Sequence, residues 1–170
     1  MRHATYYLHL ILPLIIGGCA SSIDFKDPIA VSTAIKTVHS KQDELTAYTG
    51  PIFKQDYNKL SLSARKYDRF EIAFYIISVD AIYFGAARNY DTANDLTGNK
   101  FGFRSNFKKK NYCDNSGCWQ NENFELSTTR EYLEANKERD LSIRVSGKPG
   151  AYQTFTIPAT YIKAFLSIVK

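Results

Sequence analysis

The chain has 170 residues, 44% of them hydrophobic, which is enough for one domain with a real hydrophobic core. Twelve Tyr and eleven Phe stand against a single Trp and a single Met. Because large rings pack well across pleated strands, this composition favours β-structure. The formal net charge of +5 is too small to indicate a nucleic-acid-binding protein, so no nucleic acid is expected as a partner.

The first twenty residues have the three-part layout of a bacterial secretion signal. Arg2 is the basic start, an apolar stretch covers 6–16, and two glycines precede Cys19. The alternatives are a transmembrane anchor or a buried structural cysteine. A membrane span needs about 20 apolar residues, whereas this stretch is shorter and contains His9 and Pro13. The pattern therefore favours a processing site.

The segment Ile16-Gly17-Gly18-Cys19 resembles the lipobox of bacterial lipoproteins. The resemblance implies that the signal is cleaved before Cys19, that this cysteine carries a diacylglycerol, and that its new amine is acylated. Several acyl chains bind a bilayer durably, so a membrane is the partner expected through acylated Cys19. Ala20 follows instead of Asp, and the sorting rule of the family then implies delivery to the outer membrane.

The expected organisation has three parts: a signal peptide over 1–18, a lipidated tether over 19–27 and a single domain over 28–170. The segment after the lipid site is short and polar, which suits a link between lipid and domain. This layout resembles that of small proteobacterial lipoproteins.

Strand signals dominate the first half of the domain. The apolar spacing over 29–38 fits both a helical face and a strand, and we favour a strand. A polar loop rich in Asn, Ser and Lys is predicted up to Asp68. The strongest strand signal covers 69–79, where both faces are apolar, which predicts a central strand. A second strand is predicted over 81–90.

Turns, two helices and a hairpin are predicted in the second half. A turn over 94–99 leads to a strand around 101–103, and another strand is predicted over 119–126. Thr128 and Glu131 match a capping box that would begin a short helix.

The last part of the chain changes from a period of two to a helical period. Alternation over 141–145, a Gly-Lys-Pro-Gly turn and a second run over 151–157 predict a hairpin. An amphipathic helix is predicted after Pro158. Its expected apolar face consists of Ile162, Phe165, Leu166 and Val169.

Cys113 and Cys118 enclose a short turn-forming segment, Asp-Asn-Ser-Gly. In an exported protein a disulfide is the expected state, and pairing these two leaves Cys19 over from the odd count of three. A zinc site would need about four ligands, and no further ligand lies near the pair. A redox-active dithiol more often has two intervening residues than four.

No set of residues matches a catalytic or cofactor-binding motif, so neither catalysis, a cofactor nor a metal is expected. His39 is the only histidine after the expected cleavage, and a solvated histidine is the favoured interpretation. Asp91 with Asp95, or Glu131 with Glu134, could be imagined as the acid and base of a glycosidase. Their spacing alone does not establish the required separation, and turn and helix-surface roles are favoured.

Arg104 and the run Lys108-Lys109-Lys110 interleave positive charge with aromatic residues. The ribonucleoprotein pattern fails here because a phenylalanine stands where glycine is needed. One interpretation is a solvated loop beside a strand. The other is contact with an anionic lipid or an acidic envelope protein.

The sequence thus predicts an α+β fold, mainly antiparallel β and sandwich-like, with two short helices including a C-terminal amphipathic one. The predicted function is that of a non-catalytic, lipid-anchored outer-membrane lipoprotein that binds another component of the bacterial cell envelope. One alternative is an inhibitor of a cell-wall hydrolase, or an exclusion factor, that presents the disulfide-closed tip. A carboxylate-dependent envelope hydrolase is a further alternative.

Overall fold

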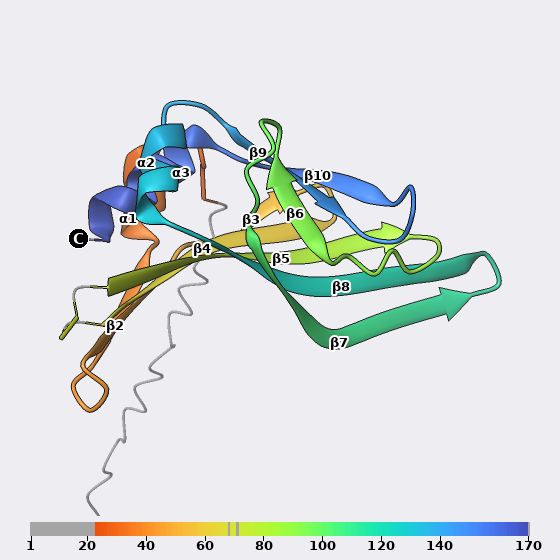
Figure 1. Cartoon of the computed structure of the whole chain (residues 1–170), viewed down its shortest axis with the longest axis horizontal. Helices are drawn as coiled ribbons and strands as arrows, with labels where there is room; N and C mark the ends of the chain where they lie inside the picture. Colours follow the sequence, from red (N-terminus) through yellow and green to blue (C-terminus); the bar gives the residue numbers. More distant parts are fainter. Residues whose placement is uncertain (1–22, 68, 71, 170) are drawn as a thin grey trace, which may run out of the picture.

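The computed structural model describes residues 23–67, 69, 70 and 72–169, with the backbone alone at 107–110. Two antiparallel sheets and three helices form the fold, which confirms the predicted α+β class. Figure 1 shows the small sheet and the helices on the same side of the large sheet. The predicted leader and Cys19 lie outside the described residues.

The large sheet has the strand order β1-β2-β4-β5-β8-β7, with β3 paired to β4, and the small sheet has the order β10-β9-β6. The strands of the large sheet are β1 (Lys36–Ser40), β2 (Leu45–Thr49), β3 (Phe53–Gln55), β4 (Asn58–Tyr67), β5 (Ile72–Phe84), β7 (Gly102–Asp114) and β8 (Gly117–Thr128). Those of the small sheet are β6 (Thr92–Asp95), β9 (Leu141–Ser146) and β10 (Tyr152–Ile157). The helices are α1 (Pro28–Thr33), α2 (Arg130–Asn136) and α3 (Ala159–Ile168).

Strand β4 occupies the segment for which a polar loop was predicted, so that prediction is wrong. Leu60, Leu62 and Ala64 are buried, and Lys59, Ser61 and Ser63, which alternate with them, face outward. The alternation of buried and outward-facing residues is therefore regular. The outward-facing residues are polar, however, and their composition is typical of a loop.

The two strands predicted over 69–79 and 81–90 are one strand of 13 residues, β5, which ends at Phe84, so the strand prediction over 85–90 is wrong. Its central position is confirmed, because β4 and β8 pair with it on either side. The strand predicted over 119–126 is also confirmed, as β8.

The favoured strand over 29–38 is wrong in its first half, which forms α1. The Asp27 side chain accepts a hydrogen bond of 2.8 Å from the Ile29 amide, and Pro28 occupies the first helical position. A carboxylate cap followed by proline is a helix start signal. Strand structure begins only at Lys36.

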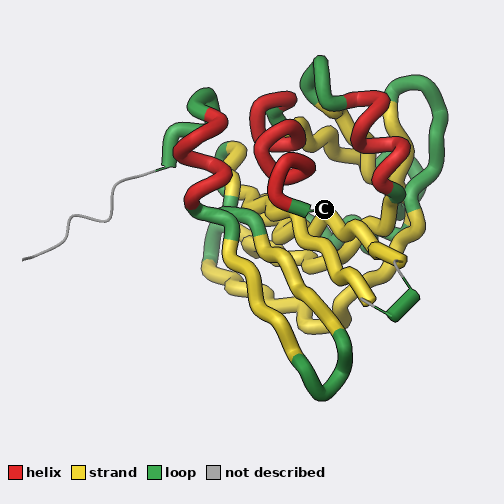
Figure 2. Tube along the Cα trace, turned by 90° about the vertical axis from the view of Figure 1, so that its left-hand side faces the viewer, coloured by secondary structure: helices red, strands yellow, loops and turns green. Residues whose placement is uncertain are grey.

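The predicted hairpin of β9 and β10 and the predicted C-terminal helix α3 are both confirmed. The predicted short helix exists as α2, but its cap is Thr129 and not Thr128: the Thr129 hydroxyl accepts from the Tyr132 amide at 3.2 Å. Figure 2 shows the three helices together on one side of the strands.

The core lies between the two sheets and beneath the helices. Phe124 on β8 is 2% exposed, and its ring contacts those of Phe103, Tyr90 and Phe155 at centroid distances of 5.1 to 6.1 Å. Aromatic pairs in such edge and stacked arrangements add to the stabilisation from burial alone. The expected apolar face of α3 is buried in the same core, since Ile162, Phe165, Leu166 and Val169 are each at most 5% exposed.

Candidate functional site

The large sheet has one face on the core and one open face. Three rows of paired residues cross part of the open face, and the register of the strands fixes them. The rows are Arg65 with Phe74; Ser63, Ile76, Ser127 and Gly102; and Ser61, Ser78, Glu125 and Arg104.

These rows enclose a groove of about 460 Å³ on the open face, and we call it the arginine groove. Tyr67, Phe74 and Ile76 provide its apolar lining. Little side-chain volume fills the bottom of the groove where Gly102 lies opposite Ser127. A Cβ at Gly102 would lie 2.1 Å from the Ser127 hydroxyl oxygen. Any larger residue at Gly102 would therefore displace the Ser127 side chain.

Two guanidinium groups line the arginine groove. Arg104 donates to the Glu125 carboxylate through Nε, at 3.1 Å, and through Nη2. Their side chains are 69% and 24% exposed, so solvent weakens this ion pair. Within the described part of the chain, the exposed Arg65 side chain has no hydrogen-bond or ion-pair partner. A planar guanidinium in this state can bind a carboxylate through two hydrogen bonds.

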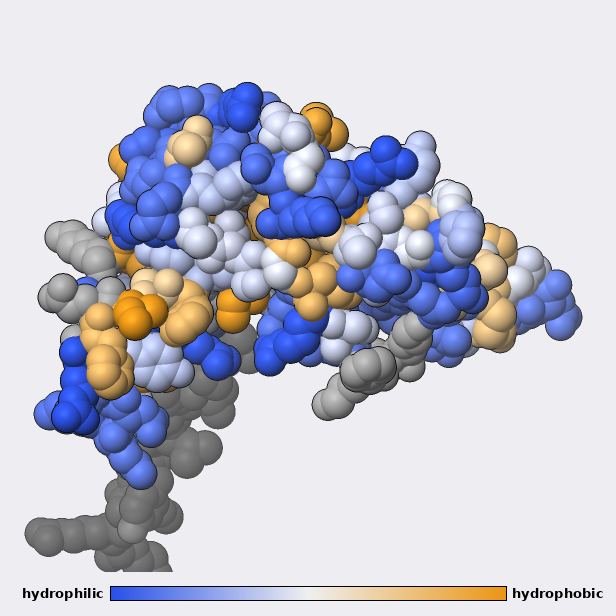
Figure 3. Space-filling view, in the orientation of Figure 1, coloured by the Kyte–Doolittle hydropathy of each residue, from blue (hydrophilic) through white to orange (hydrophobic). Residues whose placement is uncertain are grey.

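Large apolar side chains lie near Arg65, where β5 begins. Phe70, Phe74 and Ile72 are 65%, 54% and 51% exposed, and the Tyr67 ring packs edge-on against Phe74 at 6.1 Å. Figure 3 shows hydrophobic side chains gathered where β5 begins. Exposed apolar patches with a polar rim are typical of interaction sites.

A second aromatic cluster lies at the other end of the open face, beside the tip of the β7–β8 hairpin. The Trp119 ring contacts Tyr57 at 5.4 Å and Phe84 at 5.7 Å. The predicted disulfide joins Cys113 and Cys118, which face one another across this hairpin. The tip is thus covalently closed next to an aromatic surface.

Glu122 is a buried carboxylate with a structural role in the loop that follows β5. It accepts hydrogen bonds of 2.9 to 3.0 Å from the amides of Arg88, Asn89 and Tyr90, and a further one from the Tyr83 hydroxyl. Such a carboxylate takes the place of an anion bound by consecutive amides. It therefore fixes the loop and is not open to a ligand.

Asp95, which is 5% exposed, organises the turn after β6. Its carboxylate accepts hydrogen bonds from the Tyr132 hydroxyl at 2.6 Å and from Thr97 and Asn99. Burial alone would raise the pKa of Asp95, but the hydrogen bonds from Tyr132, Asn99 and Thr97 hold it well below its usual range. Asp95 therefore has a turn role, whereas Asp91 is exposed and directly precedes β6.

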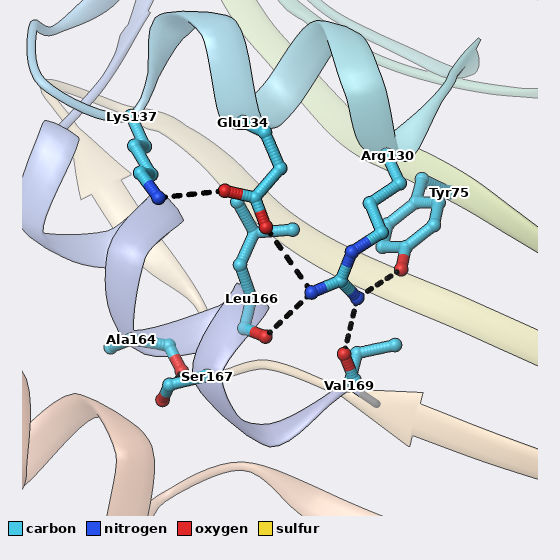
Figure 4. Close-up of polar contacts among 8 residues, drawn as sticks. All are labelled: Tyr75, Arg130, Glu134, Lys137, Ala164, Leu166, Ser167 and Val169. Atoms are coloured by element: carbon cyan, nitrogen blue, oxygen red, sulfur yellow. Dashed lines mark hydrogen bonds and ion pairs between the residues drawn. The ribbon is translucent and has the colours of Figure 1, made fainter.

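Glu134 and Arg130 belong to a polar cluster at the end of α3 (Figure 4). Arg130 donates to the backbone carbonyls of Leu166 and Val169 and to the Tyr75 hydroxyl. Glu134 accepts from Arg130 at 3.2 Å and from Lys137 at 2.8 Å. Because the last carbonyls of a helix lack partners within it, this arginine stabilises the end of α3.

His39 lies on β1, where its Nδ1 is 3.1 Å from the Thr46 hydroxyl on the neighbouring strand. Ser40 donates to Asp43 at 2.7 Å. Across the ranges that the structure covers, no three His, Cys, Asp or Glu side chains are grouped to hold a metal ion. No helix in those ranges has the length and hydropathy needed to cross a membrane.

Of the predicted anionic-contact residues, Arg104 lies in the arginine groove, and Lys108, Lys109 and Lys110 lie further along β7. The pairing of β7 with β8 is irregular between Asn106 and Lys110, and the lysine side chains are outside the description. Sequence reasoning missed Arg65, because the segment that contains it was interpreted as a polar loop.

Comparison of the chain with protein-family models, with curated proteins and with solved structures finds no match.

Proposed function

We propose that the chain is a lipid-anchored outer-membrane lipoprotein that binds another protein of the bacterial cell envelope through the arginine groove. The resemblance of Ile16 to Cys19 to a lipobox supports the anchor. The observation that carries the binding role is the arginine groove itself, with Arg65 available beside the exposed Phe74.

The composition of the groove supports a protein ligand. Arg and Tyr are enriched among the residues that contribute most to protein interfaces, and Phe is enriched in interfaces generally. An apolar side chain of the partner would pack against Phe74 and Ile76, and a neighbouring carboxylate would pair with Arg65. On the other side of the groove, the Glu125 carboxylate pairs with Arg104. A carboxylate of the ligand is disfavoured at Arg104 because Glu125 would repel it.

Crosslinking in intact cells tests the binding role. A photoreactive residue in place of Phe74 should capture an envelope protein, and Arg65→Glu should abolish the capture by charge repulsion. Tyr152 is a matched control, because it is 55% exposed but lies on the small sheet. Equal capture from both positions, or capture that Arg65→Glu does not change, would contradict the groove as the binding site.

Palmitate labelling tests the anchor separately. Cys19→Ala should abolish labelling and leave the precursor uncleaved, because the acylated sulfur is lost. Labelling of this variant at the wild-type level would refute the lipobox assignment.

The closed hairpin tip supports a second candidate function, the inhibition of a cell-wall hydrolase. Figure 1 shows the β7–β8 hairpin extending past the small sheet, and Tyr112 near its tip is 71% exposed. A rigid projecting loop of this kind could enter an enzyme cleft. If an excess of the purified protein leaves lysozyme activity unchanged, inhibition of lysozyme is excluded.

A further inference from the structure

Basic side chains gather on the open face of the large sheet. Residues that lie directly opposite one another on neighbouring strands point to the same face, so the register shows which side chains share it. Among the residues whose side chains are described, the basic residues on this face are Lys36, Lys54, Lys59, Arg65 and Arg104, and the acidic residues are Asp80 and Glu125. The open face therefore carries an excess of positive charge.

The acidic residues of the face neutralise only part of this charge. Glu125 forms the ion pair with Arg104, and Asp80 lies opposite Lys59 in the register of β5 and β4. The other basic residues of the face form no ion pair with any described residue: Lys36, Lys54 and Arg65. A partner with carboxylates can therefore pair with cations that the fold leaves free.

The helices on the other side of the large sheet differ in this respect. Arg130 and Lys137 both pair with Glu134 on α2, and Lys163 on α3 pairs with Glu138. Together with Arg104 and Glu125, these are the ion pairs of the described chain. Charge pairing is thus concentrated on the helices, whereas most basic residues of the open face lack it.

Two lysines of the open face lie directly opposite each other. Lys54 on β3 is the register partner of Lys59 on β4, and both are exposed. Like charges in directly opposite positions of neighbouring strands are destabilising. The stability of the fold therefore does not account for this pair of lysines. A carboxylate bound between the two ammonium groups would remove the repulsion.

We propose that the protein that binds the arginine groove presents an acidic surface, with carboxylates that pair with Arg65, with Lys36 and with the two opposed lysines. The inference rests on the proposed function and adds the chemistry of the partner. Arg104 is left out of this set because Glu125 already pairs with it.

The basic residues extend over a length that fits a folded partner. Lys59 and Arg65 are six positions apart on β4. At about 3.3 Å per residue, they are about 20 Å apart along the strand. A protein interface of standard size covers about 800 Å² on each partner, which spans such a length. The partner is therefore expected to contact the whole row of cations and not Arg65 alone.

The shape of the open face favours a protein over an anionic bilayer. A protein can insert an apolar side chain into the groove of about 460 Å³ and place carboxylates on the basic residues around it. A level surface of lipid headgroups would match the positive charge but would leave the groove unfilled. Complementary charge would also speed the encounter of the two proteins.

Photocrosslinking in isolated cell envelopes tests the charge of the partner. The full-length protein carries the photoreactive residue in place of Phe74, and mass spectrometry identifies the crosslinked product. Capture of an envelope protein should fall at least about threefold when salt is raised from about 50 mM to about 500 mM, because salt screens exposed charges. The crosslinked segment of the partner should be rich in Asp and Glu.

Lys54→Glu is the decisive variant, because it replaces the repulsive pair with an attractive pair to Lys59. The midpoint of urea unfolding should therefore not fall. Capture at low salt should nevertheless decrease by at least about threefold, because the new carboxylate repels those of the partner. Lys148→Glu is the matched control: it makes the same charge change at an exposed position in the turn between β9 and β10, and capture should not change.

The possible failures are distinguishable. If a protein is captured but neither salt nor Lys54→Glu changes the amount, or if both variants lower it equally, the acidic surface is overturned and the proposed function stands. A crosslinked segment without an excess of Asp and Glu has the same meaning. A crosslink to phospholipid would show that the open face contacts the bilayer and would overturn both proposals. Absence of any capture by the protein with native lysines would also overturn both.

Discussion

The two faces of β5 differ in what covers them, although both are apolar in sequence. On the covered face, Tyr75, Ile77 and Val79 are at most 2% exposed. On the open face, Ile72 and Phe74 are more than half exposed. The apolar character of the first set is explained by folding, because burial of these side chains stabilises the core. The second set is exposed on the described chain, and under the proposed function it is the surface that the partner covers. Four predictions test this difference between the faces.

The largest expected effect is on the covered side. Phe124→Ala removes a ring that contacts three other aromatic rings in the core. We expect the free energy of unfolding to fall by about 4 kcal/mol, from lost burial and the cavity that remains. Urea unfolding of the purified protein measures it. A loss below about 1 kcal/mol would mean that the small sheet does not pack on Phe124 as described.

Asp95→Asn should lower the free energy of unfolding by about 3 kcal/mol at neutral pH, because it breaks hydrogen bonds to a buried charged acceptor. The folded-state pKa of Asp95 lies below its usual value. Its contribution is therefore present above about pH 4, the unfolded pKa, and is lost as the pH falls further.

Urea unfolding between pH 7 and pH 2 tests this pH dependence. The wild type should lose stability over that interval, and Asp95→Asn should lose less. Glu125→Gln on the open face is the control, with a change near zero at pH 7. Parallel curves for the wild type and Asp95→Asn would contradict the role of the Asp95 carboxylate.

The disulfide lies at the tip of the β7–β8 hairpin. Its removal should lower the free energy of unfolding by an intermediate amount. Loop-entropy arguments give about 2 kcal/mol for a ring this short when both Cys113 and Cys118 are changed to Ser. Comparing the midpoints of urea unfolding of this double variant and the wild type measures the difference. If Cys113 and Cys118 of the wild type are alkylated without reductant as fully as with it, the bridge is absent.

The smallest effect on stability should come from the open face. Phe74→Ala should change the free energy of unfolding by less than about 1 kcal/mol, because the ring is half exposed and loses mainly its contact with Tyr67. Loss of more than about 2 kcal/mol would mean that Phe74 supports the fold, and the argument for a binding groove would fail.

Local patterns predicted the local parts of this structure. The β9–β10 hairpin and α3 follow from periodicity and from the proline and glycine between their segments. The disulfide follows from two cysteines with a turn-forming segment between them. Residues 29–33 form a helix, against the favoured prediction, because the Asp27 carboxylate and Pro28 supply a helix start that the apolar spacing alone does not show.

The arginine groove could not be predicted in the same way. The groove depends on β4, which was predicted to be a loop because it contains several serines. It also depends on the register that brings Arg65, Phe74 and Gly102 to one end of the sheet. Apolar residues on both faces of β5 predicted a central strand, whereas only tertiary structure shows which face is covered. Likewise, Glu122 meets amides more than 30 positions away.

The closure of the core by α3 has a consequence for the order of events during synthesis. The amide of Leu62 donates to the Tyr161 hydroxyl at 3.0 Å, and Arg130 holds the last carbonyls of the same helix. In a chain synthesised from its N-terminus, these contacts form only after the residues of α3 have left the ribosome. The core that α3 closes is therefore completed late, after the strands that it covers have been made.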